Sequence, residues 1–215
     1  MSLPVVIVGA GGHGRGTLEI LRARQAAGLS SPEVLGFVDD RRGQTEIDGL
    51  PLLGSGDWLI AHAREVEAIL AIASAEVKTK LAARFDSAGL GWVTAVHPSA
   101  VIGGRTEIGA GAIVGAGVVI AYDTRVGRHT TINLNATVGH DCVIGAFSTV
   151  APGVNITGNV ILEEGVEVQT NATIVPGLRL GRGSRIGPGS VVLKDVGDGE
   201  FFFGNPARRM PDPSR

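Results

Sequence analysis

The sequence repeats with a period of six residues over much of its C-terminal half. Every sixth position from Ile102 to Val192 holds Ile, Val or Leu, with no insertion or deletion between them. Each unit can form one flat face of a triangular prism, so that about 18 residues complete one turn. The aliphatic residue then points inward and a small residue sits near each corner. The second set of positions, four residues after the first, fits this expectation and includes Thr106, Ala112, Thr124, Thr130, Ala136, Cys142, Ser148, Ala172, Ser184 and Ser190.

This pattern predicts a parallel β-helix and excludes other all-β folds. A sandwich would alternate polar and apolar residues with a period of two and would vary its loop lengths. In a β-helix, equivalent residues of successive turns stack at the strand spacing of roughly 4.8 Å and form aliphatic ladders. The composition agrees, because only 4% of the residues are aromatic while 33 are glycine. Such a core consists of aliphatic side chains between frequent tight turns.

The first 95 residues follow a different pattern and predict a separate α/β domain. Short apolar runs are separated by helical patterns, as expected for a small parallel sheet of the Rossmann-like βαβ type. We therefore expect an α/β domain over residues 1–95, a β-helix over 96–196 and a C-terminal tail over 197–215. The predicted strands and helices of the first domain are Val5–Val8, Thr17–Gln25, Val34–Val38, Ala68–Ala73 and Ala75–Phe85.

A glycine-rich turn follows the first predicted strand and leads into the first helix. The segment Gly9–Arg15 reads GAGGHGR and matches the spacing G-x-G-x-x-G. Glycines allow the backbone to approach a phosphate, whose charge is met by the free N–H groups at the helix N-terminus. The second strand ends in Asp39 and Asp40, which could accept hydrogen bonds from a ribose or a base. The alternative is a tight turn with solvated carboxylates. An NAD(P)-dependent dehydrogenase is disfavoured, because its site usually requires two mononucleotide-binding halves.

One histidine has the setting of a general base. His140 lies in Val138-Gly139-His140-Asp141-Cys142, at an outward position near a prism corner. A neutral imidazole can take a proton from an attacking amine or hydroxyl, and the carboxylate of Asp141 would raise its basicity. The alternative is an ordinary surface histidine in a turn. His13, in the glycine-rich turn, is the second candidate, and no pair of histidines has the spacing of metal ligands.

Composition excludes several classes of partner. The formal net charge is −2, and no basic patch or basic amphipathic stretch points to nucleic acid or to a membrane surface. No apolar run approaches the roughly 20 residues of a membrane-spanning helix. The lone Cys142 excludes an intramolecular disulfide, and the N-terminus lacks a signal-peptide pattern. We therefore expect a soluble cytoplasmic protein with small-molecule partners.

Taken together, these features resemble the two-domain acetyltransferases of bacterial sugar biosynthesis. These enzymes belong to the hexapeptide-repeat acyltransferases and act on UDP-4-amino sugars of the bacillosamine pathway, on GDP-perosamine or on sialic acid. The resemblance implies a left-handed β-helix, a homotrimer and acetyl-coenzyme A as co-substrate, without a metal. It spans nearly the whole chain in six ordered segments, namely Val6–Arg15, Gly36–Asp40, Gly49–Gly54, His97–Ala100, Ile132–Gly145 and Gly204–Arg208.

The resemblance also implies roles for individual residues. It makes His140 the general base and Asp141 its partner, and it places Asn133 near the acceptor group. The nucleotide or sugar would be held by Gly12, His13, Gly14, Asp39, Asp40 and Ala73. Acetyl-coenzyme A would lie between neighbouring prisms, beside the 204–208 segment of the tail, on Thr149, Thr170 and Pro188.

The chain departs from the family at two of these positions. Thr149 stands where some members carry a second histidine, so any contact with the coenzyme there must differ. Ala73 ends the segment Ala71-Ile72-Ala73, where glycine is usual, so a ligand would approach this backbone more tightly.

The sequence thus leads to one main hypothesis and two alternatives. The amine of a nucleotide-linked amino sugar attacks the thioester directly, His140 removes a proton, backbone N–H groups stabilise the oxyanion and Cys142 takes no part. O-acetylation of sialic acid or a related sugar would need the same base. A non-catalytic trimeric binding or scaffold protein is the alternative of a different class.

Overall fold

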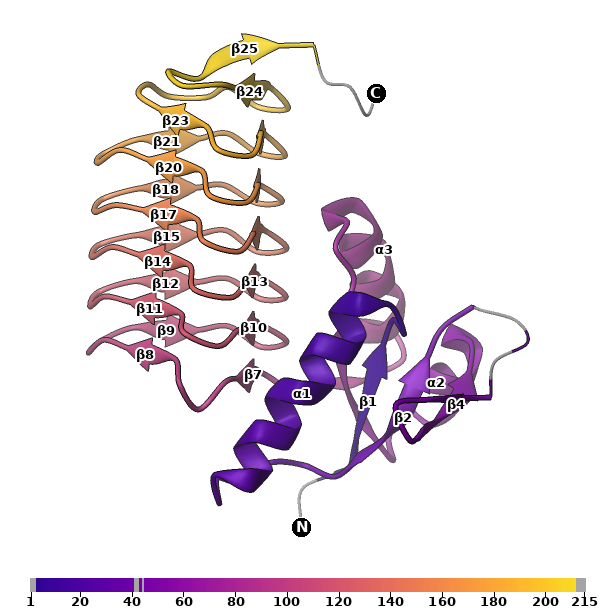
Figure 1. Ribbon diagram of the computed structural model, residues 1–215. Coiled ribbons are helices and arrows are strands. Elements are labelled where there is room, and N and C mark those ends of the chain that lie inside the picture. Colours follow the sequence, from indigo (N-terminus) through magenta and orange to yellow (C-terminus); the bar gives the residue numbers. More distant parts are fainter. Residues whose placement is uncertain (1–2, 41–42, 44, 212–215) are drawn as a thin grey trace. The chain divides into compact units, whose positions relative to one another are not determined.

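The computed structural model describes residues 3–40, 43 and 45–211. These residues form two compact units, the first ending at Pro98 and the second beginning at Ser99 (Figure 1). In the part of the chain that the structure describes, no helix is both long and apolar enough to cross a membrane.

The first unit is a six-stranded sheet in the order β3-β4-β2-β1-β5-β6. All neighbouring strands are parallel except β3 and β4, which form an antiparallel pair at one edge. The central strand β1 is fully buried, as expected for a parallel sheet covered by helices. The strands of this sheet and the helices of the unit are β1 (Val5–Val8), α1 (Gly12–Ala26), β2 (Val34–Val38), β3 (Glu46–Ile47), β4 (Leu50–Gly54), α2 (Gly56–Ala61), β5 (Glu67–Leu70), α3 (Ala75–Asp86) and β6 (Gly91–Trp92).

The α/β pattern predicted for this unit is confirmed, with two boundary errors. The helix predicted from Thr17 begins at Gly12, because the glycine-rich turn itself forms the first helical turn. Glycine is a poor helix former, so the apolar pattern hid that turn. The strand predicted to reach Ala73 ends at Leu70, where the chain leaves the sheet toward α3. The sequence did not predict β3, β4, α2 or β6, whose apolar runs are too short to give a periodic signal.

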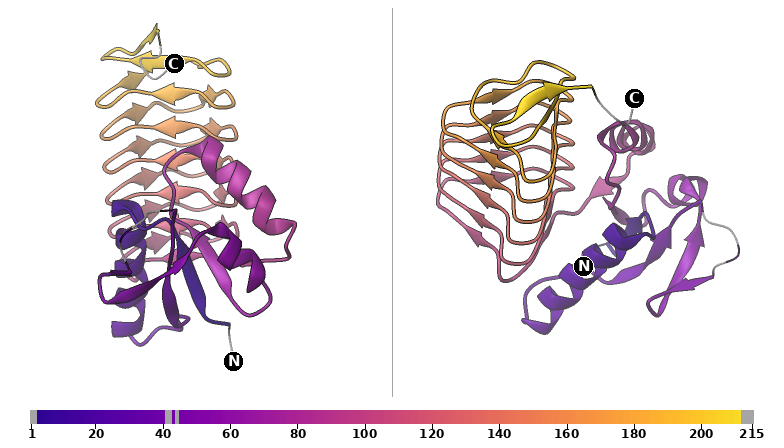
Figure 2. Two further views of the ribbon diagram at one scale, coloured as in Figure 1. Left: turned by 90° about the vertical axis from the view of Figure 1, so that its right-hand side faces the viewer. Right: turned by 45° about the horizontal axis from the view of Figure 1, so that its top comes forward.

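The second unit is a parallel β-helix of two-residue strands with three faces (Figure 2). From β8 to β23 each strand pairs with the strand 18 residues later, and only the last pairings, Arg185 with Phe201 and Leu180 with Val196, are 16 residues apart. Face 1 contains β7 (Ala95–Val96), β10 (Ile113–Val114), β13 (Thr131–Ile132), β16 (Thr149–Val150), β19 (Glu167–Val168) and β22 (Arg185–Ile186). Face 2 contains β8 (Val101–Ile102), β11 (Val119–Ile120), β14 (Thr137–Val138), β17 (Asn155–Ile156), β20 (Thr173–Ile174) and β23 (Val191–Val192). Face 3 contains β9 (Glu107–Ile108), β12 (Arg125–Val126), β15 (Val143–Ile144), β18 (Ile161–Leu162) and β21 (Arg179–Leu180).

The predicted aliphatic ladder forms the core of the prism. From Val114 to Val192 every position of the ladder is at most 4% exposed. Burial of such a side chain contributes about 1.5–3 kcal/mol. Ile102 and Ile108 are only partly buried, because they lie in the first coil and have a neighbouring coil on one side only. The second inward row also follows the prediction, since Cys142 and its equivalents Thr124 and Ser148 are 0% exposed.

Each corner turns through one residue in the left-handed conformation. Such a residue recurs at every sixth position from Arg105 to Gly189, three after an aliphatic residue, and is either a glycine or a residue with φ between 52° and 61°. Asn and Asp tolerate this conformation better than other non-glycine residues. The buried hydroxyls of Thr124, Thr130 and Ser148 donate to backbone carbonyls 15 residues later, at 2.9–3.1 Å. These three hydroxyls are therefore satisfied inside the prism, whereas the equivalent buried Oγ of Ser184 has no hydrogen-bond partner among the described residues.

The chain closes the β-helix with two further strands. β24 (Phe201–Phe203) pairs in parallel with β22, and β25 (Arg208–Met210) folds back on β24 in antiparallel fashion. The segment 197–215, predicted as a tail, therefore begins as regular structure. Its last four residues, 212–215, lie outside the described residues.

Candidate active site

Close packing at two glycines fixes the conformation of the glycine-rich turn that joins β1 to α1. A side chain at Gly9, whose φ is 101°, would come within 2.7 Å of Ile72 Cδ1 and 2.8 Å of the Ala71 carbonyl oxygen. A side chain at Gly14 would collide with the backbone of Gly9. By contrast, a Cβ at Gly12 would meet nothing within 4 Å. Gly12 is therefore not required by the packing of this unit and stays accessible to a ligand.

The N-terminus of α1 has the properties of an anion site. Gly11 caps the helix without a side-chain hydrogen bond, and the first turn contains no acidic residue. Backbone N–H groups at such an end favour a phosphate or carboxylate. Asp39 follows β2 and accepts a hydrogen bond from the Ala10 N–H at 2.7 Å, so one of its oxygens supports the turn. Asp40 and Ala73 are exposed.

The predicted nucleotide-site residues of this unit follow neighbouring parallel strands. Gly12, His13 and Gly14 come after β1, Asp39 and Asp40 come after β2, and Ala73 comes after β5. These three strands are adjacent in the sheet. Their carboxyl ends lie at one edge, which is the usual ligand side of such a sheet.

His13 is partly buried and lies close enough to Lys78 to be influenced by its charge. Burial and, second, the Lys78 ammonium group lower the pKa of His13 to about 4. His13 is therefore neutral at pH 7, and its ring has one donor and one acceptor nitrogen. Lys78, on α3, is 0% exposed. Sequence reasoning missed it, because its helical setting resembles that of Lys80, which forms an exposed pair with Glu76.

The second candidate cluster lies at the corner between faces 2 and 3, which we call the His140 corner (residues 103–106, 121–124, 139–142, 157–160 and 175–178). Asp141 adopts φ of 56°, which directs its side chain back toward the preceding residue. His140 Nδ1 is 2.7 Å from Asp141 Oδ2. Because a carboxylate only accepts hydrogen bonds, Nδ1 carries the proton and the neutral ring keeps its lone pair on Nε2. About half of each side chain is exposed, at 45% and 51%.

Cys142 lies directly behind this pair, inside the prism. Its Sγ is 3.1 Å from the Thr157 carbonyl oxygen and 3.5 Å from that of His140. Burial is the main cause that raises the pKa of the thiol above its ordinary value. The thiol therefore keeps its proton and is a poor nucleophile. Its contacts instead support the backbone of the corner.

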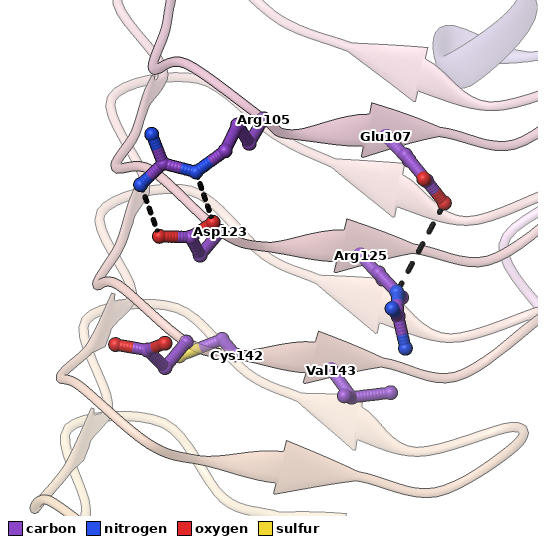
Figure 3. A pocket seen from close by; sticks show the side chains of 7 residues that line it. Arg105, Glu107, Asp123, Arg125, Cys142 and Val143 are labelled. Atoms are coloured by element: carbon purple, nitrogen blue, oxygen red, sulfur yellow. Dashed lines mark hydrogen bonds and ion pairs between the residues drawn. The ribbon is translucent and has the colours of Figure 1, made fainter.

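A groove of about 480 Å³ runs along face 3 beside the His140 corner (Figure 3). Its charged side chains pair across adjacent coils. Arg105 donates twice to Asp123, at 2.5 and 2.6 Å, and Arg125 lies 4.0 Å from Glu107. The groove gives solvent and small molecules access to the Asp141 side of the corner. Its lining residues are Arg105, Glu107, Asp123, Arg125, Asp141, Cys142 and Val143.

The remaining predicted residues lie elsewhere on the prism. Asn133, Thr170 and Pro188 lie at the corner between faces 1 and 2, which we call the Asn133 corner (residues 115–118, 133–136, 151–154, 169–172 and 187–190), and Thr149 is on face 1. Face 2 separates them from the His140 corner of the same chain. Among the described residues, no group of three His, Cys, Asp or Glu side chains could hold a metal ion.

Comparison with known proteins agrees with this architecture. The PglD N-terminal domain family matches residues 4–85. The perosamine N-acetyltransferase from Caulobacter crescentus, solved as a histidine-to-asparagine variant with CoA and GDP-perosamine, is 32% identical, with a TM-score of 0.90 over 99% of this chain and 100% of that chain. WeeI from Acinetobacter baumannii AYE is 30% identical, with a TM-score of 0.88 over 97% and 100%.

A third structure is the acetyltransferase domain of PglB from Neisseria gonorrhoeae FA1090 in complex with acetyl coenzyme A. It is 27% identical, with a TM-score of 0.90 over 98% of this chain and 100% of that chain. No curated protein sequence matches the chain. The fold is thus an α/β domain followed by a left-handed β-helix. The chain belongs to the hexapeptide-repeat sugar acetyltransferases, and it is an acetyltransferase.

We predict that His13 makes the protein less stable in mild acid. The folded-state pKa of about 4 lies below the ordinary value of 6.5, so the unfolded chain binds more protons between these values. The free energy of unfolding therefore falls as pH falls through this window, by about 2 kcal/mol at pH 5 from this group. Urea denaturation of wild type and His13→Gln at pH 7.5 and pH 5 measures the difference. Equal losses of stability in both proteins would contradict the prediction.

Proposed function

We propose that the protein transfers the acetyl group of acetyl-coenzyme A to the amino group of a nucleotide-linked amino sugar, with His140 as general base. The observation that carries the proposal is the 2.7 Å contact between His140 Nδ1 and Asp141, which leaves Nε2 as the proton acceptor on an exposed corner. The relatives solved with coenzyme A and GDP-perosamine, and with acetyl coenzyme A, support the choice of both substrates. The Caulobacter crescentus enzyme has also been solved with a histidine replaced, which agrees with a functional histidine in these proteins.

The reaction follows from the chemistry of these groups. The sugar amine attacks the thioester carbonyl carbon while its N–H proton passes to Nε2 of His140. The carbon–sulfur bond then breaks and the coenzyme thiolate leaves, taking the proton back from the imidazolium. Asp141 favours the transient imidazolium by its charge and by holding Nδ1–H. Cys142 takes no covalent part, because its buried thiol remains protonated.

The nucleotide part of the acceptor would bind at the N-terminal end of α1. The uncapped N–H groups of this helix suit a pyrophosphate, and Gly12 leaves room for its approach. His13, neutral at pH 7, would donate or accept one hydrogen bond rather than pair with the phosphate as a cation. Asp39, Asp40 and Ala73 would line the same edge of the sheet.

Replacement of His140 tests the catalytic proposal. His140→Asn should lower kcat by roughly 10² to 10⁴, the usual contribution of a positioned base, with little change in the KM for acetyl-coenzyme A. His62→Asn, at the end of α2, is the control. Thiol release is measured with UDP-linked 4-amino sugars, GDP-perosamine and free sialic acid as acceptors. Full activity of His140→Asn would contradict the assignment, and turnover of sialic acid alone would favour O-acetylation.

Substitution at Gly12 tests the nucleotide site. Gly12→Ala and Gly16→Ala both lie on α1, and a Cβ at either position would meet nothing within 4 Å. Both should fold, because alanine favours a helix by about 1 kcal/mol over glycine. Only Gly12→Ala should raise the KM for the nucleotide sugar, by roughly tenfold, or about 1.4 kcal/mol. Identical KM values for the two variants would place the nucleotide elsewhere.

We further propose that the active protein is a homotrimer whose coenzyme sites lie between chains. The predicted coenzyme residues Thr149 and Thr170 and the acceptor residue Asn133 lie at or near the Asn133 corner, whereas His140 lies at another corner. One site can contain both groups only if two chains contribute. A trimer with threefold symmetry contains three such interfaces, and each one joins the His140 corner of one chain to the Asn133 corner of the next.

Mixed trimers test this arrangement. His140→Asn and Thr170→Trp, a substitution at an exposed position that would fill the proposed coenzyme site, should each be nearly inactive alone. Unfolding and refolding equal amounts of the two variants together should restore about a quarter of the wild-type activity. In a randomly mixed trimer, about a quarter of the interfaces join a chain that keeps His140 to a chain that keeps Thr170. Light scattering on the same samples gives the mass. No recovery of activity in a mixed trimer, or an active monomer, would contradict the proposal.

A further inference from the structure

The imidazole of His140 lies between residues of the two neighbouring coils. Tyr122 and Gly158 occupy the equivalent corner position, one turn before and one turn after it, as the pairing of β11, β14 and β17 requires. The constant register places all three residues in one column along the His140 corner. The imidazole of His140 therefore has one of these two residues on either side, one coil away.

Tyr122 covers one face of the imidazole. The two ring centroids are 5.4 Å apart and the ring planes differ by 11°, so the rings are stacked nearly parallel. Stacked aromatic rings attract each other beyond the effect of their buried area. The stack opposes rotation of the imidazole out of the plane in which it contacts Asp141.

Gly158 lies against the other face. A Cβ at this position would be 2.7 Å from Nε2, 2.8 Å from Cε1 and 3.2 Å from Cδ2 of His140. Because three ring atoms are at nearly the same distance, the added carbon would meet the flat side of the ring. The φ angle of Gly158 lies outside the left-handed region, so the backbone does not require glycine here. The imidazole itself is what excludes a side chain.

These contacts leave one edge of the ring open. Tyr122 covers one face, Gly158 the other, and Asp141 holds Nδ1, while 45% of the side chain stays exposed. Nε2 is the ring nitrogen that Asp141 does not contact. We propose that Tyr122 and Gly158 are positioning residues that hold the His140 imidazole with Nε2 directed at the acceptor. The inference rests on the proposed role of His140 as the base.

Positioning of this kind has a measurable effect on the rate. A misplacement of about 1 Å can cost about a hundredfold in rate, because proton transfer needs a near-attack geometry. Gly158→Ala should therefore lower kcat by roughly 10- to 100-fold with an unchanged KM for acetyl-coenzyme A. Gly104→Ala is the matched control, since Gly104 has the same corner position and a Cβ there would meet nothing within 4 Å.

Two substitutions of Tyr122 separate stacking from general folding effects. Tyr122→Phe keeps an aromatic ring over the imidazole and should keep the wild-type kcat. Tyr122→Leu removes the ring but keeps an apolar side chain, and it should lower kcat by roughly tenfold, which corresponds to about 1.4 kcal/mol. The kinetics use the acceptor that gives the highest turnover in the panel above, and melting temperatures confirm that each variant is folded.

A spectroscopic measurement needs no acceptor. In protein with ¹³C-labelled histidine, the Cε1–H resonance of His140 is assigned by its loss in His140→Asn. The stacked ring of Tyr122 should shift this resonance upfield, so it should move downfield in Tyr122→Leu and stay in place in Tyr122→Phe and Gly104→Ala. Gly158→Ala should also move it.

The outcomes separate this inference from the proposed function. Suppose that His140→Asn is inactive while Gly158→Ala and Tyr122→Leu keep the wild-type kcat and resonance position. The positioning role of Tyr122 and Gly158 is then wrong, but His140 is still the base. If Gly104→Ala loses as much activity as Gly158→Ala, the effect is general to the corner and the inference is also wrong. If His140→Asn is fully active, the catalytic proposal itself fails.

Discussion

The rest of the prism depends on its constant register of one coil every 18 residues. Each coil can stack on the previous one only if all three corners bend at the same positions, and a left-handed residue three positions after each aliphatic residue makes that bend. The aliphatic ladder and the inward hydroxyls then repeat without adjustment. A single insertion would move every later side chain to the wrong face, as for a slipped strand in any sheet.

The same register creates the candidate active site. It brings residues that are 18 apart in the sequence into one column, so a catalytic histidine at a corner has predetermined neighbours above and below. At the His140 corner these are an aromatic ring and a glycine, and the left-handed conformation of Asp141 adds a carboxylate from the side. The neighbours of an exposed corner side chain are thus fixed by the same register that fixes the core. Preorganisation of this kind is what a general base requires.

In the α/β unit, the candidate ligand site depends on close backbone packing and not on a repeated register. Its glycine-rich turn is shaped by close backbone packing at Gly9 and Gly14, and the open space at Gly12 remains for a ligand. The burial of His13 and, second, the charge of Lys78 lower the pKa of His13, so its imidazole is neutral near the helix N-terminus. A neutral imidazole leaves the attraction for an anion to the helix N–H groups. In the proposed function, this unit selects the nucleotide and the prism supplies the base.

The sequence by itself determined the repeat fold, the α/β unit and the identities of His140 and Asp141 as candidates, because periodic burial and strand-turn-helix signals are local. It could not predict that α1 begins at Gly12 or that Lys78 is buried, since these depend on packing between distant elements. The tertiary structure alone decided that the His140 imidazole lies between Tyr122 and Gly158. It also separated the His140 corner from the Asn133 corner, because only the wound coil defines which residues share an edge.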